Sequence, residues 1–487
     1  MEFTPVLYIA IPLFAAFLIP LLGRISKELV KLTPGVVLLF LSYGSVTLFP
    51  KAMEKPIVEK IAGFAPPFGI SLYYGPTAAF LVTLVTLIGF VIWLYSYKFI
   101  IREPLEKYYM LFMMLITGST GILLTGDIFN LFVFLEITAI AAYSLTAFLR
   151  DKDGAEAAFK YLLIGSFASA FFLLSVMIIY SYTGTLNLAD IAQNADKIPA
   201  TAKGFVLILV LSGMGIEAEM FPLNGWAPDA YSQAPSPIGA VFGGIVVKAG
   251  IYAMMRIIFL LFNTPDVLHF LLIMGLITLL IAEMSAMKQQ QIKRMLAFSS
   301  IGQMGLVIIA FSIGTSESVS AAFFQMFNHA VIKSLLFFAA GYLVFHSGSK
   351  NLKDLEGLGY DKPITSFFFA LGALAIMGLP PFSGFWSKLY VLISIAHGGH
   401  LVILALILIG SVIEAVYYLR VIAKLYTRKA VPENVRRTPV SGLIAMGVLA
   451  AVILAVGIYP SLVTKWLAPA ANNLIDAGSY IASGLIQ

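Results

Sequence analysis

Five charged side chains lie in the middle of long apolar stretches, and they are the residues of this sequence most able to do chemistry. They are Glu136, Glu217, Lys248, Lys333 and Lys388. A charged side chain at the centre of a bilayer costs about 2.5–3.5 kcal/mol, so such residues normally face a protein interior or a watery cavity. There they pair with one another and carry protons or ions. We therefore interpret these five residues as a candidate ion pathway.

The rest of the chain predicts a membrane setting for these charges. Of its 487 residues, 60% are hydrophobic and 11% are charged, whereas a soluble protein carries about 25% charged residues. A spanning helix needs about 20 mostly apolar residues. We therefore expect an all-α polytopic membrane protein with about 14 transmembrane helices, near 4–23, 34–50, 75–98, 108–125, 128–149, 159–182, 204–226, 237–262, 266–287, 295–313, 319–345, 364–396, 400–427 and 440–466.

The basic residues predict how these helices are oriented in the cell (inner or plasma) membrane. Lys and Arg are concentrated in alternate connections, as expected for cytoplasmic loops of a multi-pass protein. Both termini are then predicted on the outer side. The net charge of +6 is explained by these loops and by anionic lipid, so nucleic acid is not indicated as a partner. The predicted cytoplasmic connections are 24–33, 98–107, 150–160, 227–236, 288–294, 346–363 and 420–437.

Several kinds of catalytic site are not expected in this chain. It has no cysteine, which excludes disulfides, thiolate metal sites and iron–sulfur ligation. The five histidines are scattered without metal-ligand spacing, and no glycine-rich phosphate loop is present. We expect no cofactor and no metal site, and we expect any redox chemistry of a parent complex to lie in partner subunits.

Two of the predicted helices contain breaks. The seventh runs into MFPLNGWAPDAYSQAPSP, which includes Pro222, and the twelfth contains MGLPPFSGFWSK, with Pro380 and Pro381. Such breaks are tolerated where protein or water satisfies the freed carbonyls. Paired breaks are typical of inverted-repeat transporters. We predict two inverted five-helix repeats, helices 4–8 and 9–13, with two unrelated proline kinks as the alternative.

These features divide the chain into four expected regions. The outer-face segment 51–74 combines charge, Pro and Gly with short apolar runs, which predicts a small hairpin. The regions are 1–107 (helices 1–3 with that segment), 108–262 (first repeat), 263–430 (second repeat) and 431–487 (helix 14 and the tail).

Long ordered motifs resemble one known family over roughly residues 70–430. They include TGDIFNLFVFLEITAIAAYSL (125–145), FPLNGWAPDAYSQAPSPIGAVFGGIVVKAGIYAMMR (221–256), FNHAVIKSLLFFAAGYLVFH (327–346) and MGLPPFSGFWSKLY (377–390). The sequence resembles the proton-antiporter-type membrane subunits shared by Mrp cation/proton antiporters, respiratory complex I and energy-converting membrane-bound hydrogenases. It is most similar to the Mrp D-type subunit and its complex I and hydrogenase relatives.

This resemblance implies roles for the buried residues. Glu136 matches the family's glutamate of helix 5, Lys248 its lysine of helix 8, and Lys333 its lysine of helix 11. Lys388 matches the distal lysine of helix 12, from which protons leave after passing along a central polar axis. His329 lies four residues before Lys333 and shares its helix face, so we expect both to line that axis. Glu414, in the predicted helix 13, is a further pathway candidate, with a structural pairing to Arg420 or a partner subunit as the alternative.

Glu217 departs from the family pattern, in which a lysine stands at this position of helix 7 and forms an ion pair with the helix 5 glutamate. Beside Glu136 it would form a like-charge pair, in which one acid binds a proton with raised affinity. The acids could share a proton, hold a hard cation such as sodium, or mark a copy of the subunit that has lost pumping and kept a structural role. Glu219, two positions further on, points to a different face and cannot simply replace Glu217. Glu283 is expected to reach the cytoplasmic interface, and Asp127 to cap helix 5.

We therefore predict an ion-translocating, antiporter-like membrane subunit of a multisubunit complex, either an Mrp-type antiporter or a redox-driven complex. The transported ion is H⁺, with Na⁺/H⁺ exchange as a second option. The expected partners are other membrane subunits and the lipid bilayer. Two alternatives stay open: a non-pumping subunit that scaffolds its neighbours, and a stand-alone secondary antiporter.

Overall fold

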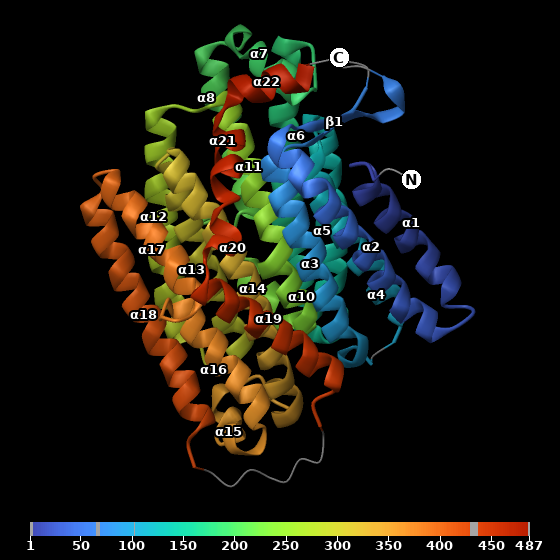
Figure 1. The fold of residues 1–487 in the computed structure, drawn as a ribbon, viewed down its shortest axis with the longest axis vertical. Coiled ribbons are helices and arrows are strands. Elements are labelled where there is room, and N and C mark those ends of the chain that lie inside the picture. Colours follow the sequence, from blue (N-terminus) through green and yellow to red (C-terminus); the bar gives the residue numbers. More distant parts are fainter. Residues whose placement is uncertain (1–2, 65–68, 102, 429–436, 486–487) are drawn as a thin grey trace.

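The computed structural model describes residues 3–64, 69–101, 103–428 and 437–485. The chain forms a bundle whose helices run roughly along its long axis (Figure 1). Within the described ranges, 12 helices are long and apolar enough to cross a membrane, and α1 and α16 are shorter apolar helices. These helices account for the predicted spans. The twelfth predicted span is the broken one, and α16 and α17 together form it. The prediction of an all-α polytopic membrane protein is confirmed.

The long helices have the following bounds. They are α1 (Leu7–Leu22), α2 (Lys27–Glu54), α3 (Pro76–Phe99), α4 (Leu105–Leu124), α5 (Ile128–Thr146), α6 (Lys152–Thr183), α8 (Ala200–Glu217), α11 (Val247–Leu261), α12 (Pro265–Lys288), α13 (Ile292–Ser312), α14 (Ser316–Ser347), α16 (Pro363–Met377), α17 (Ser383–His397), α18 (Leu401–Leu425) and α19 (Val440–Ile458). The shorter helices are α7 (Leu188–Gln193), α9 (Ala227–Gln233), α10 (Ser236–Val241), α15 (Leu358–Asp361), α20 (Ser461–Thr464), α21 (Leu467–Ile475) and α22 (Ala477–Leu485), with 3-10 turns at Ile61–Gly63, Ala195–Lys197 and Leu352–Leu355.

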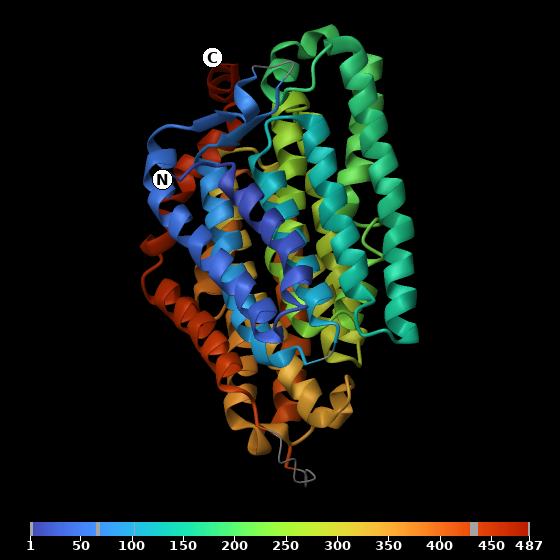
Figure 2. The same cartoon turned by 90° about the vertical axis from the view of Figure 1, so that its right-hand side faces the viewer.

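One of the most buried helices of the bundle is also one of the longest. Helix α14 begins at a capping box in which the side chains of Thr315 and Ser318 each accept the other residue's backbone N–H, and it ends at Gly348, whose φ is +72°. Between these caps nearly every side chain is buried, because a helix that is apolar all round must lie inside protein or lipid. By contrast, α6 lies at the edge of the bundle (Figure 2) and exposes large apolar side chains such as Phe167 and Met177.

Both predicted helix breaks are present. Helix α8 ends at Glu217 and turns lead to α9, while α16 ends at Met377 and α17 begins at Ser383. The freed carbonyls find donors: Trp226 Nε1 donates to the Ile216 carbonyl at 3.2 Å, and Lys388 Nζ donates to the Met377 carbonyl at 3.3 Å. The inverted relation between the two halves stays a prediction.

The eighth span contains an irregularity that the sequence analysis did not predict. Between α10 and α11, residues Phe242–Val246 form the π-helical segment η3. Segments of this kind occur frequently at functional sites. Here the segment lies immediately before Lys248 in the chain.

The predicted hairpin in the segment 51–74 is confirmed. Strands β1 (Ile57–Lys60) and β2 (Ser71–Tyr74) pair antiparallel, and its residues 65–68 lie outside the described ranges. The C-terminal helix α22 lies near α7 and β1 at one end of the bundle, and α15 lies at the other (Figure 1). The rings of Tyr73 and Tyr480 meet with centroids 4.7 Å apart, so the hairpin and the C-terminal helix pack together.

Candidate ion-translocation site

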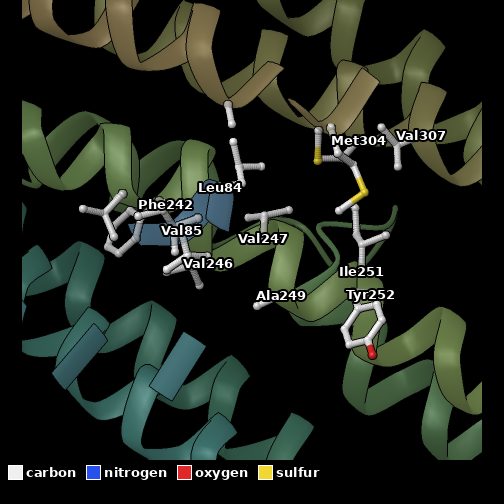
Figure 3. Packing of buried hydrophobic residues seen from close by; sticks show 14 of the residues in the cluster. Leu84, Val85, Phe242, Val246, Val247, Ala249, Ile251, Tyr252, Met304 and Val307 are labelled. Atoms are coloured by element: carbon white, nitrogen blue, oxygen red, sulfur yellow. The ribbon is translucent and has the colours of Figure 1, made fainter. Parts of the chain in front are cut away.

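Lys248 lies in the first turn of α11, where it is 2% exposed. Its neighbours on α11 and η3 are apolar, including Val246, Val247 and Ala249 (Figure 3). The ammonium finds two polar contacts: it donates to the Gly243 carbonyl of the π-helical segment, and it meets His329 Nδ1. The irregular backbone of η3 thus supplies an acceptor to a charge that the surrounding apolar side chains cannot satisfy.

His329 and Lys333 lie one turn apart on α14, and both are fully buried. The second ring nitrogen of His329 meets the Ser300 hydroxyl at 3.2 Å. Lys333 Nζ donates to the Leu296 carbonyl and to the Tyr418 hydroxyl, both at 3.1 Å. The sequence prediction that His329 and Lys333 line one polar axis matches this placement, whereas Tyr418 was not foreseen.

Lys388 and Glu414 form a buried ion pair between α17 and α18. The other carboxylate oxygen of Glu414 accepts from Gln303 Nε2 at 2.7 Å, and Gln303 in turn accepts from Gln325 at 2.6 Å. The alternative pairing of Glu414 with Arg420 is wrong, because that guanidinium donates to backbone carbonyls of residues 287 and 289. Both ionic partners therefore have the additional hydrogen bonds that a buried pair needs.

These contacts form an almost continuous line from Lys248 to Lys388. Direct contacts join Lys248 to His329, Lys333 to Tyr418, and Glu414 to Lys388. Between them lie two steps of one helical turn, each about 5.4 Å long: one on α14, and one on α18 from Tyr418 to Glu414. A single water can bridge polar groups over such a step, so the line is suited to proton transfer.

The acids of the first half of the bundle (residues 108–262, with 263–430 as the second half) are arranged differently. Glu136 on α5 is partly buried and accepts from the Ser169 hydroxyl on α6. Glu217, at the end of α8, is 9% exposed and lines a cavity of about 10 Å³ together with Ser169, which is room for about one water molecule. The two carboxylates are close enough to interact electrostatically. In the part of the chain that the structure describes, neither forms an ion pair.

Two further buried acids were misjudged or missed. Glu283 on α12 is 1% exposed and accepts from the Tyr417 hydroxyl at 2.9 Å, so the expectation that it reaches the interface is wrong. Glu219 is fully buried with φ at +56°, a left-handed conformation that costs a residue other than glycine about 1–3 kcal/mol. The only signal in the sequence was that Glu219 lies directly before the proline break. Helical periodicity does not predict the direction of a side chain at such a place.

A bundle of membrane-spanning helices with a line of buried lysines, acids and histidine defines an antiporter-like membrane subunit. A family model described as "NADH:quinone oxidoreductase/Mrp antiporter, TM" matches residues 125–414. The chain belongs to this family, as the motifs of its sequence suggested.

Proteins similar to this chain belong to more than one kind of complex. The chain is 34% identical to the N subunit of the NADH-quinone oxidoreductase of Desulforudis audaxviator, with 93% of this chain and 95% of that one covered. It is also 34% identical to the D-type subunit of the Na⁺/H⁺ antiporter of Alkalihalophilus pseudofirmus, over 69% of each chain. Among solved structures, a chain of the membrane-bound sulfane sulfur reductase, an archaeal respiratory membrane complex, matches at 41% identity with a TM-score of 0.94, covering 98% of this chain and 99% of that one. These relatives place the chain among subunits of multisubunit membrane complexes.

Proposed function

We propose that this chain translocates protons as a membrane subunit of a redox-driven multisubunit complex. The observation that carries the proposal is the line of contacts from Lys248 through His329, Lys333 and Tyr418 to the Glu414–Lys388 pair. Each of its side chains can hold or pass a proton, and the line leads from α11 through α14 and α18 to α17. Exchange of Na⁺ against H⁺ is the competing option for the two acids of the first half.

Translocation in this proposal proceeds by changes of protonation along that line. A buried lysine releases its proton more readily when a nearby acid is neutralised or moves away, because an opposite charge favours the ammonium form. Opening of the Lys388–Glu414 pair would therefore let Lys388 lose a proton to one side, and closing it would favour uptake from the other. A membrane potential acts on each charge moved by about 2.3 kcal/mol per 100 mV.

The parent complex is inferred from similarity. The solved chain at 41% identity belongs to a sulfane sulfur reductase, which favours a redox-driven complex over an independent antiporter. The electrons would pass through partner subunits, since this chain has no cysteine to hold an iron–sulfur cluster. Charge movement in this subunit is then driven from outside it.

We also propose that both termini face the outer side of the cell membrane. The basic loops support this orientation, and so does the position of α15, in a predicted cytoplasmic loop, at the end of the bundle opposite α7 and α22 (Figure 1). Because the chain has no cysteine, single substitutions at the exposed positions Thr201 and Lys353 can report sidedness. An impermeant thiol reagent applied to whole cells should label Thr201→Cys and not Lys353→Cys; the reverse pattern would invert the orientation.

The proposed function is tested in the complex purified through a tag on this subunit and reconstituted in liposomes. Reduced viologen and polysulfide supply electron donor and acceptor, and a pH-sensitive dye reports proton movement. We expect Lys248→Ala and Lys388→Ala to assemble and to lose proton movement. Unaltered coupling in both variants would leave a non-pumping scaffold, and transport by the isolated chain would identify a stand-alone antiporter.

A further inference from the structure

Glu219 is a buried carboxylate with no role in the pathway described so far. It is fully buried, and neither of its carboxylate oxygens has a hydrogen bond of normal geometry among the described residues. A buried carboxylate in this state is strongly disfavoured unless another charge or a proton compensates it. Its position in the fold therefore needs an explanation.

The backbone directs Glu219 away from Glu217. Helix α8 ends at Glu217, and the positive φ of Glu219 turns the chain before Pro222. Glu217 faces the cavity that Ser169 lines on α6. Glu219 instead lies toward Tyr231 on α9 and close enough to Lys248 for an electrostatic interaction. The two acids still interact electrostatically with each other, but Glu217 lines the cavity whereas Glu219 lies toward Tyr231 and Lys248.

Close packing brings the break in the seventh span against the start of α11. A Cβ on Gly250 would lie 3.0 Å from the Glu217 carbonyl oxygen, and a Cβ on Gly243 would lie 3.5 Å from the Tyr231 ring. Gly243 is the residue whose carbonyl accepts from the Lys248 ammonium. The break thus packs against the chain on both sides of Lys248, and Glu219, which belongs to this break, interacts electrostatically with Lys248.

Lys248 lacks the acidic partner that a buried ammonium normally has. Its polar contacts are a carbonyl and the His329 ring, and it forms no ion pair within the described residues. Lys333 also interacts with Glu219, but more strongly with Glu414 and Glu283. A negative charge on Glu219 therefore balances Lys248 in the first place.

We propose that Glu219 is the acid that exchanges a proton with Lys248 during translocation. The proton leaves the ammonium nitrogen and joins a carboxylate oxygen, with the Tyr231 hydroxyl or one water as the bridge. The pair then passes from ammonium and carboxylate to amine and carboxylic acid, and its net charge is zero in both states. Lys248 can therefore discharge without leaving an isolated charge in the protein. This inference rests on the proposed function. It assigns the acid that works with Lys248 to Glu219, in the break after α8, instead of to Glu217 at the end of that helix.

Transport in the reconstituted complex tests the proposal through matched variants. We expect Glu219→Gln to assemble and to lower protons moved per electron at least about tenfold, and Glu219→Asp to restore most of that loss because it keeps an ionisable oxygen. Wild-type coupling in Glu219→Gln would overturn the inference, and so would a Glu219→Asp variant as defective as the Gln variant. If Lys388→Ala abolishes coupling while Glu219→Gln does not, this inference alone fails; if neither changes it, the proposed function fails.

Stability gives a second readout that does not depend on transport. Charge balance predicts that Glu219→Gln and Lys248→Met each lower the Tm of the complex, and that the double variant has a higher Tm than either single variant. Glu217→Gln combined with Lys248→Met is the matched comparison, and its effects should add. Additive effects in the Glu219 cycle would overturn the pairing.

Discussion

The two halves of the bundle treat buried charge in opposite ways. In the second half, Lys388 and Glu414 form an ion pair whose remaining groups are satisfied by Gln303 and a backbone carbonyl. In the first half, Glu136 and Glu217 carry the same sign and are separated by a hydroxyl and a cavity of about 10 Å³. One half holds Lys388 and Glu414 as an ion pair, whereas Glu136 and Glu217 form no ion pair within the described residues.

This difference indicates a division of work along the axis. A satisfied buried pair opens only at a large cost, which suits a gate at the distal end. Two neighbouring acids bind a shared proton readily, because like charges disfavour double ionisation, which suits a site of proton uptake. The following experiments are designed to break or sharpen this contrast.

The largest effect is expected from breaking the distal pair. Lys388→Met leaves Glu414 as a buried charge without its partner, and we expect a loss of about 3–5 kcal/mol in the free energy of unfolding. Thermal and denaturant unfolding of the complex measure it. The double variant Lys388→Met with Glu414→Leu should recover most of the loss, and purely additive effects would show that the pair is not coupled.

A second experiment introduces an ion pair into the first half of the bundle, like the one that the second half already has. Glu217→Lys introduces a cation beside Glu136. We expect this variant to assemble, because attraction replaces the repulsion between like charges. We also expect it to lower proton movement about tenfold, equivalent to 1.4 kcal/mol. Proton movement per electron in liposomes is the measurement, with Glu217→Gln as the neutral control. Raised coupling in Glu217→Lys would instead identify the first half as degenerate.

Tyr418→Phe removes the hydroxyl that connects Lys333 to α18 and Ser299. We expect a loss of about 1–3 kcal/mol in stability, because Lys333 keeps one acceptor but loses another, and slower proton movement. Tyr417→Phe, on the same helix, loses a hydrogen bond to Glu283 instead and is the matched control. Equal transport rates in the two variants would place Tyr418 outside the pathway.

The smallest effect is expected at Asp127, which caps α5 by accepting the Asn130 N–H at 2.7 Å. Asp127→Ala should cost about 1 kcal/mol, whereas Asp127→Asn keeps the cap. Burial raises the pKa of this carboxyl, so loss of its charge in the Asn variant should be tolerated. Both variants should keep wild-type coupling; a transport defect in Asp127→Asn would add this residue to the pathway.

The fold could be predicted almost completely from the sequence, because span length, apolar composition and proline breaks act locally. The helix-face argument also placed His329 beside Lys333 correctly. The tertiary contacts could not be predicted in the same way. The partner of Glu414 proved to be Lys388 rather than Arg420, because ion pairs between helices depend on packing that periodicity does not specify.

The irregular segments show where sequence reasoning ends. A residue after the last turn of a helix has no periodic direction, so Glu219 could not be assigned to the side of Lys248. The π-helical segment before Lys248 has no signal in the sequence either. Both features lie beside functional candidates, where local rules are most often broken.

The account depends most directly on proton transfer through the middle of the line. Lys333 is the best position for the test, because Met keeps most of the aliphatic chain of lysine. Lys333 forms no ion pair within the described residues, so Lys333→Met leaves no carboxylate without a direct partner. The measurement is the number of protons moved per electron by the reconstituted complex. We predict that Lys333→Met keeps electron transfer and loses most proton movement. An unchanged ratio of protons to electrons would contradict the account.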